Sequence, residues 1–167
     1  MGGGCVNIPG AVQKYAAVCR NGDVMYSHLD EPLYDEKYCR ICGKEIITRC
    51  PSCNAPIKGS YEIRDTIPFG RYTPPNYCPN CAAPFPWTQA KIQNAAKIIE
   101  EEENFSEEQR DKLVEVLPDV VVETPKTQLA AVRVKKALQS AGQFTVEGLR
   151  QFLMDCGCEL VKKLIGM

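Results

Sequence analysis

The chain has a single histidine, His28, and almost no excess of charge: its 167 residues carry a formal net charge of -1. A catalytic zinc site usually draws on histidine ligands, and a Ser-His-Asp triad needs its histidine in a formed cleft, so neither is expected. No apolar run approaches the roughly 20 residues of a membrane-spanning helix, and phosphate-loop motifs are absent. These absences lead us to expect neither an enzyme nor an integral membrane protein.

Positive charge is too scarce in either half of the chain to favour a nucleic-acid binder. Residues 1–87 carry nine Lys or Arg and eight Asp or Glu, and residues 88–167 carry 11 and 13. Phosphate binding draws its affinity from excess positive charge, and thiolates bound to Zn2+ would make the first half more negative. Nucleic-acid binding is therefore an alternative hypothesis, resting on a local patch of Arg40, Lys44, Arg49 and Lys58.

Cysteine, in contrast, is abundant, with ten residues. The start MGGGCVNIPG lacks the charged-then-apolar pattern of a secretion signal, so we expect a cytoplasmic protein. In such a chain Cys-x-x-Cys pairs indicate metal binding before disulfides, and two pairs complete a tetrahedral structural zinc site. Six cysteines form three such pairs: Cys39/Cys42, Cys50/Cys53 and Cys78/Cys81.

Three pairs leave one pair in need of further ligands, which lie upstream in VCRNGDVMYSHL. The turn Asn21-Gly22 would bring Asp23 back towards Cys19, so both can join the unmatched pair. We therefore expect two Zn2+ ions per chain. The predicted ligands are Cys50, Cys53, Cys78 and Cys81 for an all-cysteine site, and Cys19, Asp23, Cys39 and Cys42 for a mixed site.

Two other assignments of the ligands stay open. The first two pairs could share one ion, which would leave Cys78 and Cys81 to find Cys19. His28 could also replace Asp23, because imidazole suits zinc better than a carboxylate does beside thiolates. The remaining cysteines have no pair spacing, and we expect them to be free or packed as small apolar residues; they are Cys5, Cys156 and Cys158.

Around the pairs, short apolar stretches alternate with turn residues, as in EIITRCP and SYEIRDTIPFG. The period of two in Ile46/Thr48 and Tyr61/Ile63 predicts short β-hairpins between rubredoxin-like knuckles. Residues 54–77 would form a protruding loop whose aromatic and arginine side chains are typical of interface hot spots. In that loop we expect Phe69 and Tyr77 to pack over the zinc sites, and Arg71 and Tyr72 to be exposed, beside Tyr61 and Arg64.

Residues 88–167 predict three or four helices. Pro84 and Pro86 stop any regular element before Thr88, which can cap a helix that runs to about Glu103. A capping box of Ser106 and Gln109 begins a second helix, expected to end before Pro118. The third and fourth helices are expected over 125–141 and from about 145 nearly to the end of the chain.

The fourth of these helices has an apolar stripe that includes Val146, Leu149, Leu153 and Cys156. We expect it to pack against the preceding helix, through Leu129, Val132, Val134 and Leu138. The other interpretations are a dimer interface and adsorption of this amphipathic helix to a membrane surface.

The runs CRNGD, YCRICG, CPSCNAPIKGSY and PPNYCPNCAAPFPWT, followed by helices, resemble a small bacterial family of double zinc ribbons with no known function, the domain of unknown function 2321 family. The likeness covers almost the whole chain, including TPKTQLAAVR. The first motif of that family usually reads Cys-x-x-Gly-His, so the resemblance implies Asp23, which follows Gly22, as the position-matched ligand. It implies a double zinc-ribbon fold and no activity.

We therefore predict an α+β protein: a flexible tail over residues 1–14, a tandem zinc-ribbon domain over 15–87 and a helical region over 88–167. The zinc ions are expected to be structural. The predicted function is protein recognition or assembly in the bacterial cytoplasm, with the helices as a docking or homo-oligomerisation surface.

Overall fold

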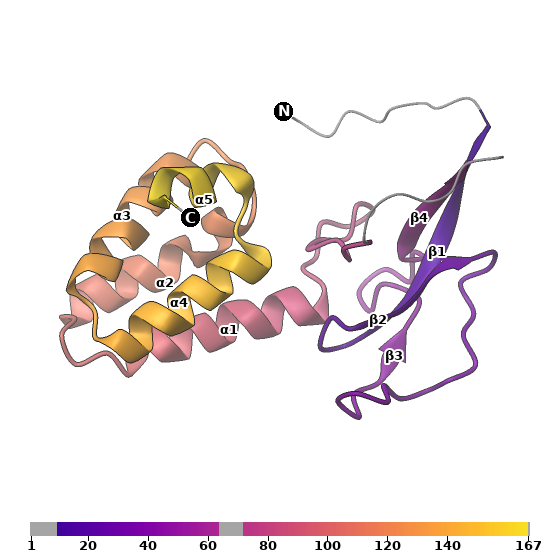
Figure 1. Ribbon diagram of the computed structural model, residues 1–167, viewed down its shortest axis with the longest axis horizontal. Helices are drawn as coiled ribbons and strands as arrows, with labels where there is room; N and C mark the ends of the chain where they lie inside the picture. The colour runs from indigo at the N-terminus through magenta and orange to yellow at the C-terminus, as the bar shows by residue number, and fades with distance from the viewer. Residues whose placement is uncertain (1–9, 64–71, 167) are drawn as a thin grey trace. The chain divides into compact units, whose positions relative to one another are not determined.

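The structure is a computed structural model that describes residues 10–63 and 72–166. The chain divides into two compact units, Met1–Trp87 and Thr88–Met167. The first holds a small antiparallel sheet with the cysteine knuckles, and the second is helical (Figure 1). This arrangement confirms the predicted α+β class.

One long strand organises the sheet of the N-terminal unit. β1 (Ala11–Cys19) pairs antiparallel with β2 (Val24–Leu29), β3 (Ile46–Ile47) and β4 (Lys58–Ile63). It begins inside the tail expected over residues 1–14, of which residues 1–9 lie outside the described part of the chain. Since β1 ends at Cys19, the sheet carries this cysteine to the first knuckle, which holds Cys39 and Cys42.

The strands approach one another very closely at Gly59 in β4. A Cβ atom there would lie 2.2 Å from the carbonyl oxygen of Ser27 in β2 and 2.6 Å from that of Tyr15 in β1. No side chain fits at such distances, so the three strands meet here only because the residue is glycine.

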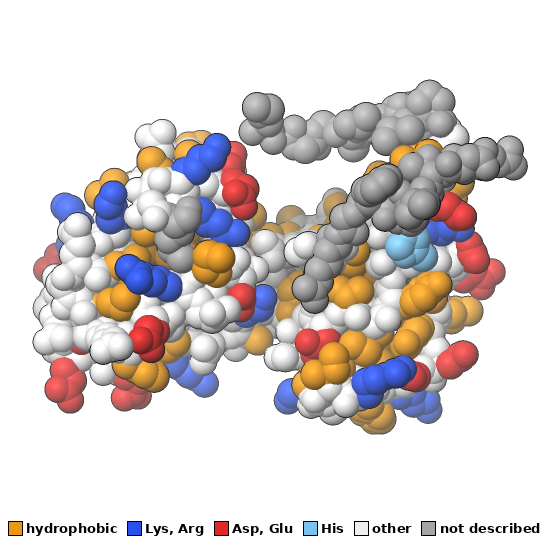
Figure 2. Space-filling view, in the orientation of Figure 1, with side chains coloured by type: hydrophobic (Ala, Val, Ile, Leu, Met, Phe, Trp, Pro, Cys, Tyr) orange, Lys and Arg blue, Asp and Glu red, His pale blue; other side chains and the backbone are white. Residues whose placement is uncertain are grey.

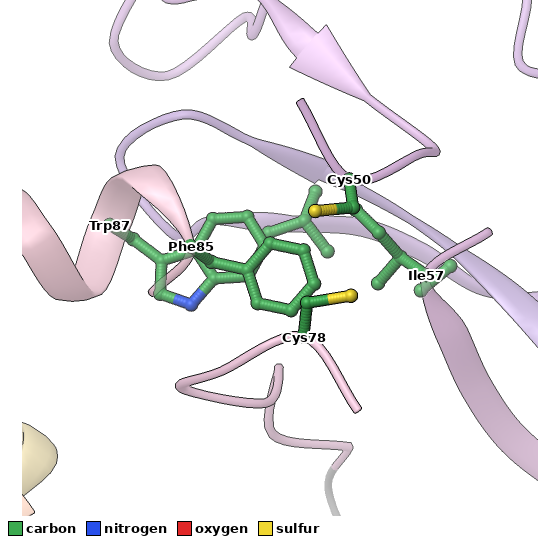
Figure 3. Close-up of a cluster of buried hydrophobic side chains, with 7 residues drawn as sticks. Cys50, Ile57, Cys78, Phe85 and Trp87 are labelled. Atoms are coloured by element: carbon green, nitrogen blue, oxygen red, sulfur yellow. The ribbon is translucent and has the colours of Figure 1, made fainter. Parts of the chain in front are cut away.

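The core of this unit is small and joins the sheet to the cysteines. Phe85 and Trp87 stack with their ring centroids 4.6 Å apart, and Trp87 donates its indole N–H to the carbonyl oxygen of Pro75 at 3.0 Å. Figure 3 shows the stacked rings beside Cys50, Ile57 and Cys78. Two residues of this core, Cys50 and Cys78, are expected metal ligands, so few purely apolar side chains stabilise the unit by burial.

Tyr72 differs from its prediction as an exposed residue of a protruding loop. It is partly buried against this core, and its hydroxyl donates to the carbonyl oxygen of Lys58 at 2.7 Å. Burial raises the pKa of Tyr72 to about 12. Arg64, Phe69 and Arg71, predicted in the same loop, lie outside the described residues.

The helical unit has five helices in the described residues, one more than the upper prediction. They are α1 (Pro86–Glu100), α2 (Glu107–Val121), α3 (Thr127–Ser140), α4 (Gln143–Cys156) and α5 (Glu159–Ile165). The extra helix arises because the expected fourth helix is divided at Gly157. There the amide of Cys158 donates to the carbonyl oxygen of Val120 in α2, instead of continuing the helical ladder.

Three details of the helical prediction were wrong. Thr88 is fully buried inside the first turn of α1 rather than its cap, since α1 begins at Pro86. α2 continues through Pro118, which lies on the exposed face, where water can satisfy the carbonyl group that lacks a donor. On α3, Leu129 and Val132 are about half exposed, whereas Val134 is buried as predicted, together with Thr127, Ala130, Ala131 and Ala137.

Two further helical predictions agree with the structure. The capping box is present: the Ser106 hydroxyl accepts from the Gln109 amide, and the Gln109 side chain accepts from the Ser106 amide. Leu149, Leu153 and Cys156 of the predicted stripe are buried. Among the residues that the structure describes, no helix combines the length and apolar character that a membrane crossing requires.

Candidate metal centre

The three Cys-x-x-Cys segments adopt one and the same backbone turn. In each, the amide of the first cysteine donates to a carbonyl oxygen five residues later, from Cys39 to Lys44, Cys50 to Ala55 and Cys78 to Ala83, at 2.8 to 2.9 Å. The carbonyl of the first cysteine accepts from the amide four residues later. Such a turn presents both thiols of a pair on one side, where they can reach one ion.

The same turn demands a left-handed residue just after the second cysteine. The residue there has a φ of 69° at Gly43, 60° at Asn54 and 57° at Ala82. Glycine and asparagine tolerate this conformation, whereas alanine pays roughly 1 to 2 kcal/mol for it. The third knuckle therefore keeps its turn against a local cost, which a bound ion would offset.

The turn at Cys19 is one residue shorter. Its amide donates to the carbonyl of Asp23 at 2.9 Å, and its carbonyl accepts from the amide of Gly22. Gly22 has a φ of 96°, and a Cβ atom on it would lie 3.1 Å from Cβ of Trp87. The hairpin between β1 and β2 thus places Asp23, rather than a second cysteine, next to Cys19.

The larger group of thiols joins the second and third knuckles. The ligand atoms of Cys50, Cys53, Cys78 and Cys81 all lie within 4.8 Å of one another. The Sγ atoms are 3.8 Å apart between Cys50 and Cys81 and 3.7 Å apart between Cys53 and Cys78. A tetrahedral ion with metal–sulfur bonds of about 2.3 Å separates its sulfurs by about 3.8 Å, whereas a disulfide needs about 2.05 Å. The group fits a metal ion and not a pair of disulfides.

The second group joins the first knuckle to the β1–β2 hairpin. It contains Cys19, Asp23, Cys39 and Cys42, again with all ligand atoms within 4.8 Å of one another. The Sγ atoms of Cys19 and Cys42 are 3.7 Å apart, and Oδ2 of Asp23 lies 3.1 Å from Sγ of Cys19 and 3.7 Å from that of Cys39. Three thiols and one carboxylate also supply four donors at tetrahedral spacing.

In each group one thiol has a lowered pKa and another a raised one: Cys53 and Cys81 in the all-cysteine group, and Cys39 and Cys19 in the mixed group. The Ala55 backbone amide, assisted by the Asn80 side chain, lowers the pKa of the Cys53 thiol to about 6. Burial and the hydrogen bond to Asp23 raise the pKa of the Cys19 thiol to about 12, and the Cys19 hydrogen bond lowers that of the Asp23 carboxyl. An ion that binds either group must therefore displace at least one thiol proton, that of Cys81 in the all-cysteine group and that of Cys19 in the mixed group.

The aromatic stack ties the two groups into one structure. Trp87 contacts Gly22 in the Cys19 turn, and Phe85 belongs to the same buried cluster as Cys50 and Cys78. The Asn21-Gly22 turn was predicted from the sequence, but Trp87 did not stand out as part of a site. The one available signal was that Trp87 is the single tryptophan of the chain.

The structure brings all eight predicted ligands into the two predicted groups of four. It does not bring the first and second Cys-x-x-Cys pairs together within the described residues. His28 belongs to neither group; its Nδ1 atom lies 3.0 Å from the Ser27 hydroxyl, and its Nε2 atom is buried without a hydrogen-bond partner in the described part of the chain.

The other cysteines are not ligands in either group. Cys156 is buried on α4, where burial raises the pKa of its thiol to about 11 and its S–H donates to the carbonyl of Phe152. Cys158 is partly buried before α5, and Cys5 lies outside the described residues.

Comparison with known proteins places the whole arrangement in one family. The model of the family described as an uncharacterized protein conserved in bacteria (DUF2321) matches residues 12–165, which include every residue of both cysteine groups. No curated protein and no solved structure matches the chain. The match confirms the resemblance seen in the sequence motifs, and the chain belongs to this bacterial family, DUF2321.

Proposed function

We propose that this protein is a non-catalytic, zinc-binding module for protein recognition or assembly in the bacterial cytoplasm, with two structural Zn2+ ions. Zinc is the ion that tetrahedral sets of thiolate ligands favour. Each group offers four donors, so a bound ion has no position left for a substrate, unlike catalytic zinc. The free state of the described cysteines suits a reducing compartment.

One observation carries the recognition role: large apolar side chains stand exposed around the first knuckle. We call these residues the knuckle surface; they are Leu33, in the segment that leads to the knuckle, and Tyr38 and Ile41, within two residues of Cys39, and they are 69%, 67% and 72% exposed. Figure 2 shows hydrophobic side chains, in orange, on the surface of the N-terminal unit. Tyr38 and Ile41 flank Cys39 in sequence, so the ion that fixes this knuckle would also hold the apolar side chains in place.

Exposed aromatic and aliphatic groups on a rigid turn are typical of residues that anchor a protein interface. The backbone around them is pinned, because the amide of Ile41 donates to Sγ of Cys39 at 3.4 Å and Tyr38 forms an isolated bridge with Glu45. A partner that binds here would pay little entropy for ordering the loop. The knuckle surface therefore supports a binding role better than a catalytic one.

Photo-cross-linking in cells tests this function. A photoreactive phenylalanine analogue placed at Tyr38 or Ile41 should give the same discrete cross-linked protein, and a second substitution, Leu33→Asp, should abolish it. The control position is Thr73, an exposed polar residue of the same unit. Identical cross-linking profiles at all three positions, or no cross-linked protein at Tyr38 and Ile41, would contradict the proposal.

A further inference from the structure

The helical unit has a hollow that neither metal group uses. It lies between α2 and α3, with a volume of about 160 Å3, and we call it the α2/α3 hollow. Its floor consists of Phe105, Leu113 and Ala137, each 4 to 5% exposed. Its rim consists of Lys112, Arg133 and Lys136, with no acidic residue in its lining.

The size of the hollow decides what kind of group it can hold. Cofactor and drug-sized sites measure roughly 300 to 1,000 Å3, whereas an apolar cavity of about 150 Å3 holds a benzene ring. The α2/α3 hollow therefore has room for one side chain of the size of leucine or phenylalanine. Its occupant is best supplied by another polypeptide.

The charges of the rim side chains indicate which charge that polypeptide should carry. Lys112 pairs with Glu108, and Arg133 pairs with Glu115 at 3.6 Å, but these two glutamates are 77% and 75% exposed. Such exposed pairs contribute about 1 kcal/mol or less and exchange readily. Lys136 has no ion pair with any residue that the structure describes. An incoming carboxylate would meet one unpaired cation and two weakly paired ones.

We propose that the α2/α3 hollow binds an acidic segment of a partner protein, which inserts one apolar side chain between flanking carboxylates. This inference goes beyond the proposed function, which concerns the knuckle surface, and it gives the docking role expected of the helices a partner of stated chemistry. The apolar floor would supply affinity by desolvation, and the cationic rim would supply selection for acidic sequences. Binding should weaken as salt is added, because the rim charges are exposed.

The test is a nuclear magnetic resonance titration of the full-length, zinc-loaded protein with the peptide acetyl-Glu-Glu-Leu-Glu-Glu-amide. Saturable amide shifts are expected at Leu113, Ala137 and Ser140. The double variant Arg133→Glu/Lys136→Glu should weaken the binding at least about tenfold, the difference expected from reversing two rim charges. Glu115→Gln should strengthen it, because a competing carboxylate is removed.

The controls separate charge, shape and folding. Lys97→Glu reverses an exposed cation of α1 that does not line the hollow, and it should leave the affinity unchanged. Peptides with alanine for leucine, or with glutamine for glutamate, should lose the binding. Unchanged affinity in the Arg133→Glu/Lys136→Glu variant, with unchanged helical circular dichroism, would overturn the inference, as would shifts scattered over the protein or absent.

The two proposals fail in distinguishable ways. If the acidic peptide does not bind while Tyr38 and Ile41 still cross-link to one protein, the inference is overturned and the proposed function stands. If the peptide binds with the expected pattern but the knuckle surface captures no protein, the recognition role of that surface fails and the hollow remains a docking site.

Discussion

The two units of this protein are held together by different means. In the helical unit the buried side chains are mostly apolar and come from all five helices, as with Ile99, Leu117, Val134, Leu153 and Val161. In the N-terminal unit four of the buried residues are the candidate metal-ligand cysteines Cys19, Cys39, Cys50 and Cys78, and apart from the Phe85/Trp87 stack and Ile57 few large apolar side chains are buried. One unit therefore has a broad apolar core, whereas the other has little buried besides its cysteines, so the proposed ions would matter to the N-terminal unit alone.

Removing the metal should unfold the N-terminal unit and leave the helical unit folded, which is the largest difference that we expect between the two. A zinc chelator withdraws binding free energy on the order of 10 kcal/mol from a structural site, more than the small N-terminal core can replace. Trp87, the single tryptophan, is buried in the core of this unit, and we expect its fluorescence to shift to the red. Circular dichroism at 222 nm, which follows the helices, should keep most of its amplitude; joint loss of both signals would show that the units are not independent.

A substitution that creates a cavity in the helical core should destabilise the helical unit and leave the N-terminal unit unchanged. Leu153 is 1% exposed, and Leu153→Ala should lower the free energy of unfolding of the helical unit by about 2 to 5 kcal/mol. Thermal melts at 222 nm measure this loss, while the zinc content and Trp87 fluorescence at room temperature should stay constant. Leu129→Ala, at a position that is 54% exposed, is the matched control and should change the melt little. A loss of zinc in Leu153→Ala would break the comparison.

Alanine substitutions at two glycines of the N-terminal unit distinguish the cost of backbone strain from the cost of a packing clash. Gly43→Ala meets no atom within 4 Å and should cost only the left-handed strain, roughly 1 to 2 kcal/mol. Gly22→Ala adds a contact of 3.1 Å with Trp87, so its cost should be larger, with weaker metal retention by the Cys19 group. Competition with a chromogenic chelator measures this retention. Equal retention in the two variants would mean that Trp87 does not support the first site.

Acid should lower the free energy of unfolding of the helical unit, because it protonates the Glu102 carboxylate. This residue is only 6% exposed. The hydrogen bond from Thr145, followed by that from the amide of Asn104, lowers its pKa below the ordinary value of 4.5, and the Gly142 amide donates at 2.8 Å. A lowered folded-state pKa adds stability above 4.5, which is lost as the pH falls through the folded value.

Glu102→Gln tests this contribution. The variant should be less stable near neutral pH by about 1 to 3 kcal/mol, and its melts at 222 nm should change less than those of the wild type between pH 6 and pH 3. Glu101→Gln, one residue earlier and exposed, is the control. Parallel pH profiles for the wild type and Glu102→Gln would rule out this role.

Local patterns in the sequence predicted more than long-range ones. Spacing was enough to find the cysteine pairs, and the Asn21-Gly22 turn was enough to place Asp23 beside Cys19, because both depend on neighbours in the chain. The central role of β1 was not predictable in this way. Its pairing with β4 joins Ala11 to Ile63, and no local signal specifies such a partner. Likewise, the break before α5 depends on a hydrogen bond from Cys158 to Val120, far away in sequence.

The passage of α2 through Pro118 illustrates the same limit. Proline usually ends a helix, but Val120 and Val121 beyond it are buried, and their burial favours continuing the turn. On α3 the periodic pattern included Leu129 and Val132, yet the helix packs through its alanines, which allow a closer approach to its neighbours. Tertiary packing decided both outcomes.

Native mass spectrometry of the purified full-length protein counts the bound metal ions and is the most decisive experiment. We expect two zinc ions per chain in the wild type. Cys78→Ser should retain one, Cys19→Ser should retain one, the double variant should retain none, and Cys156→Ser should keep both. Two tightly held ions in Cys19→Ser, or a single ion in the wild type, would contradict the claim that two separate groups of four ligands hold the N-terminal unit together.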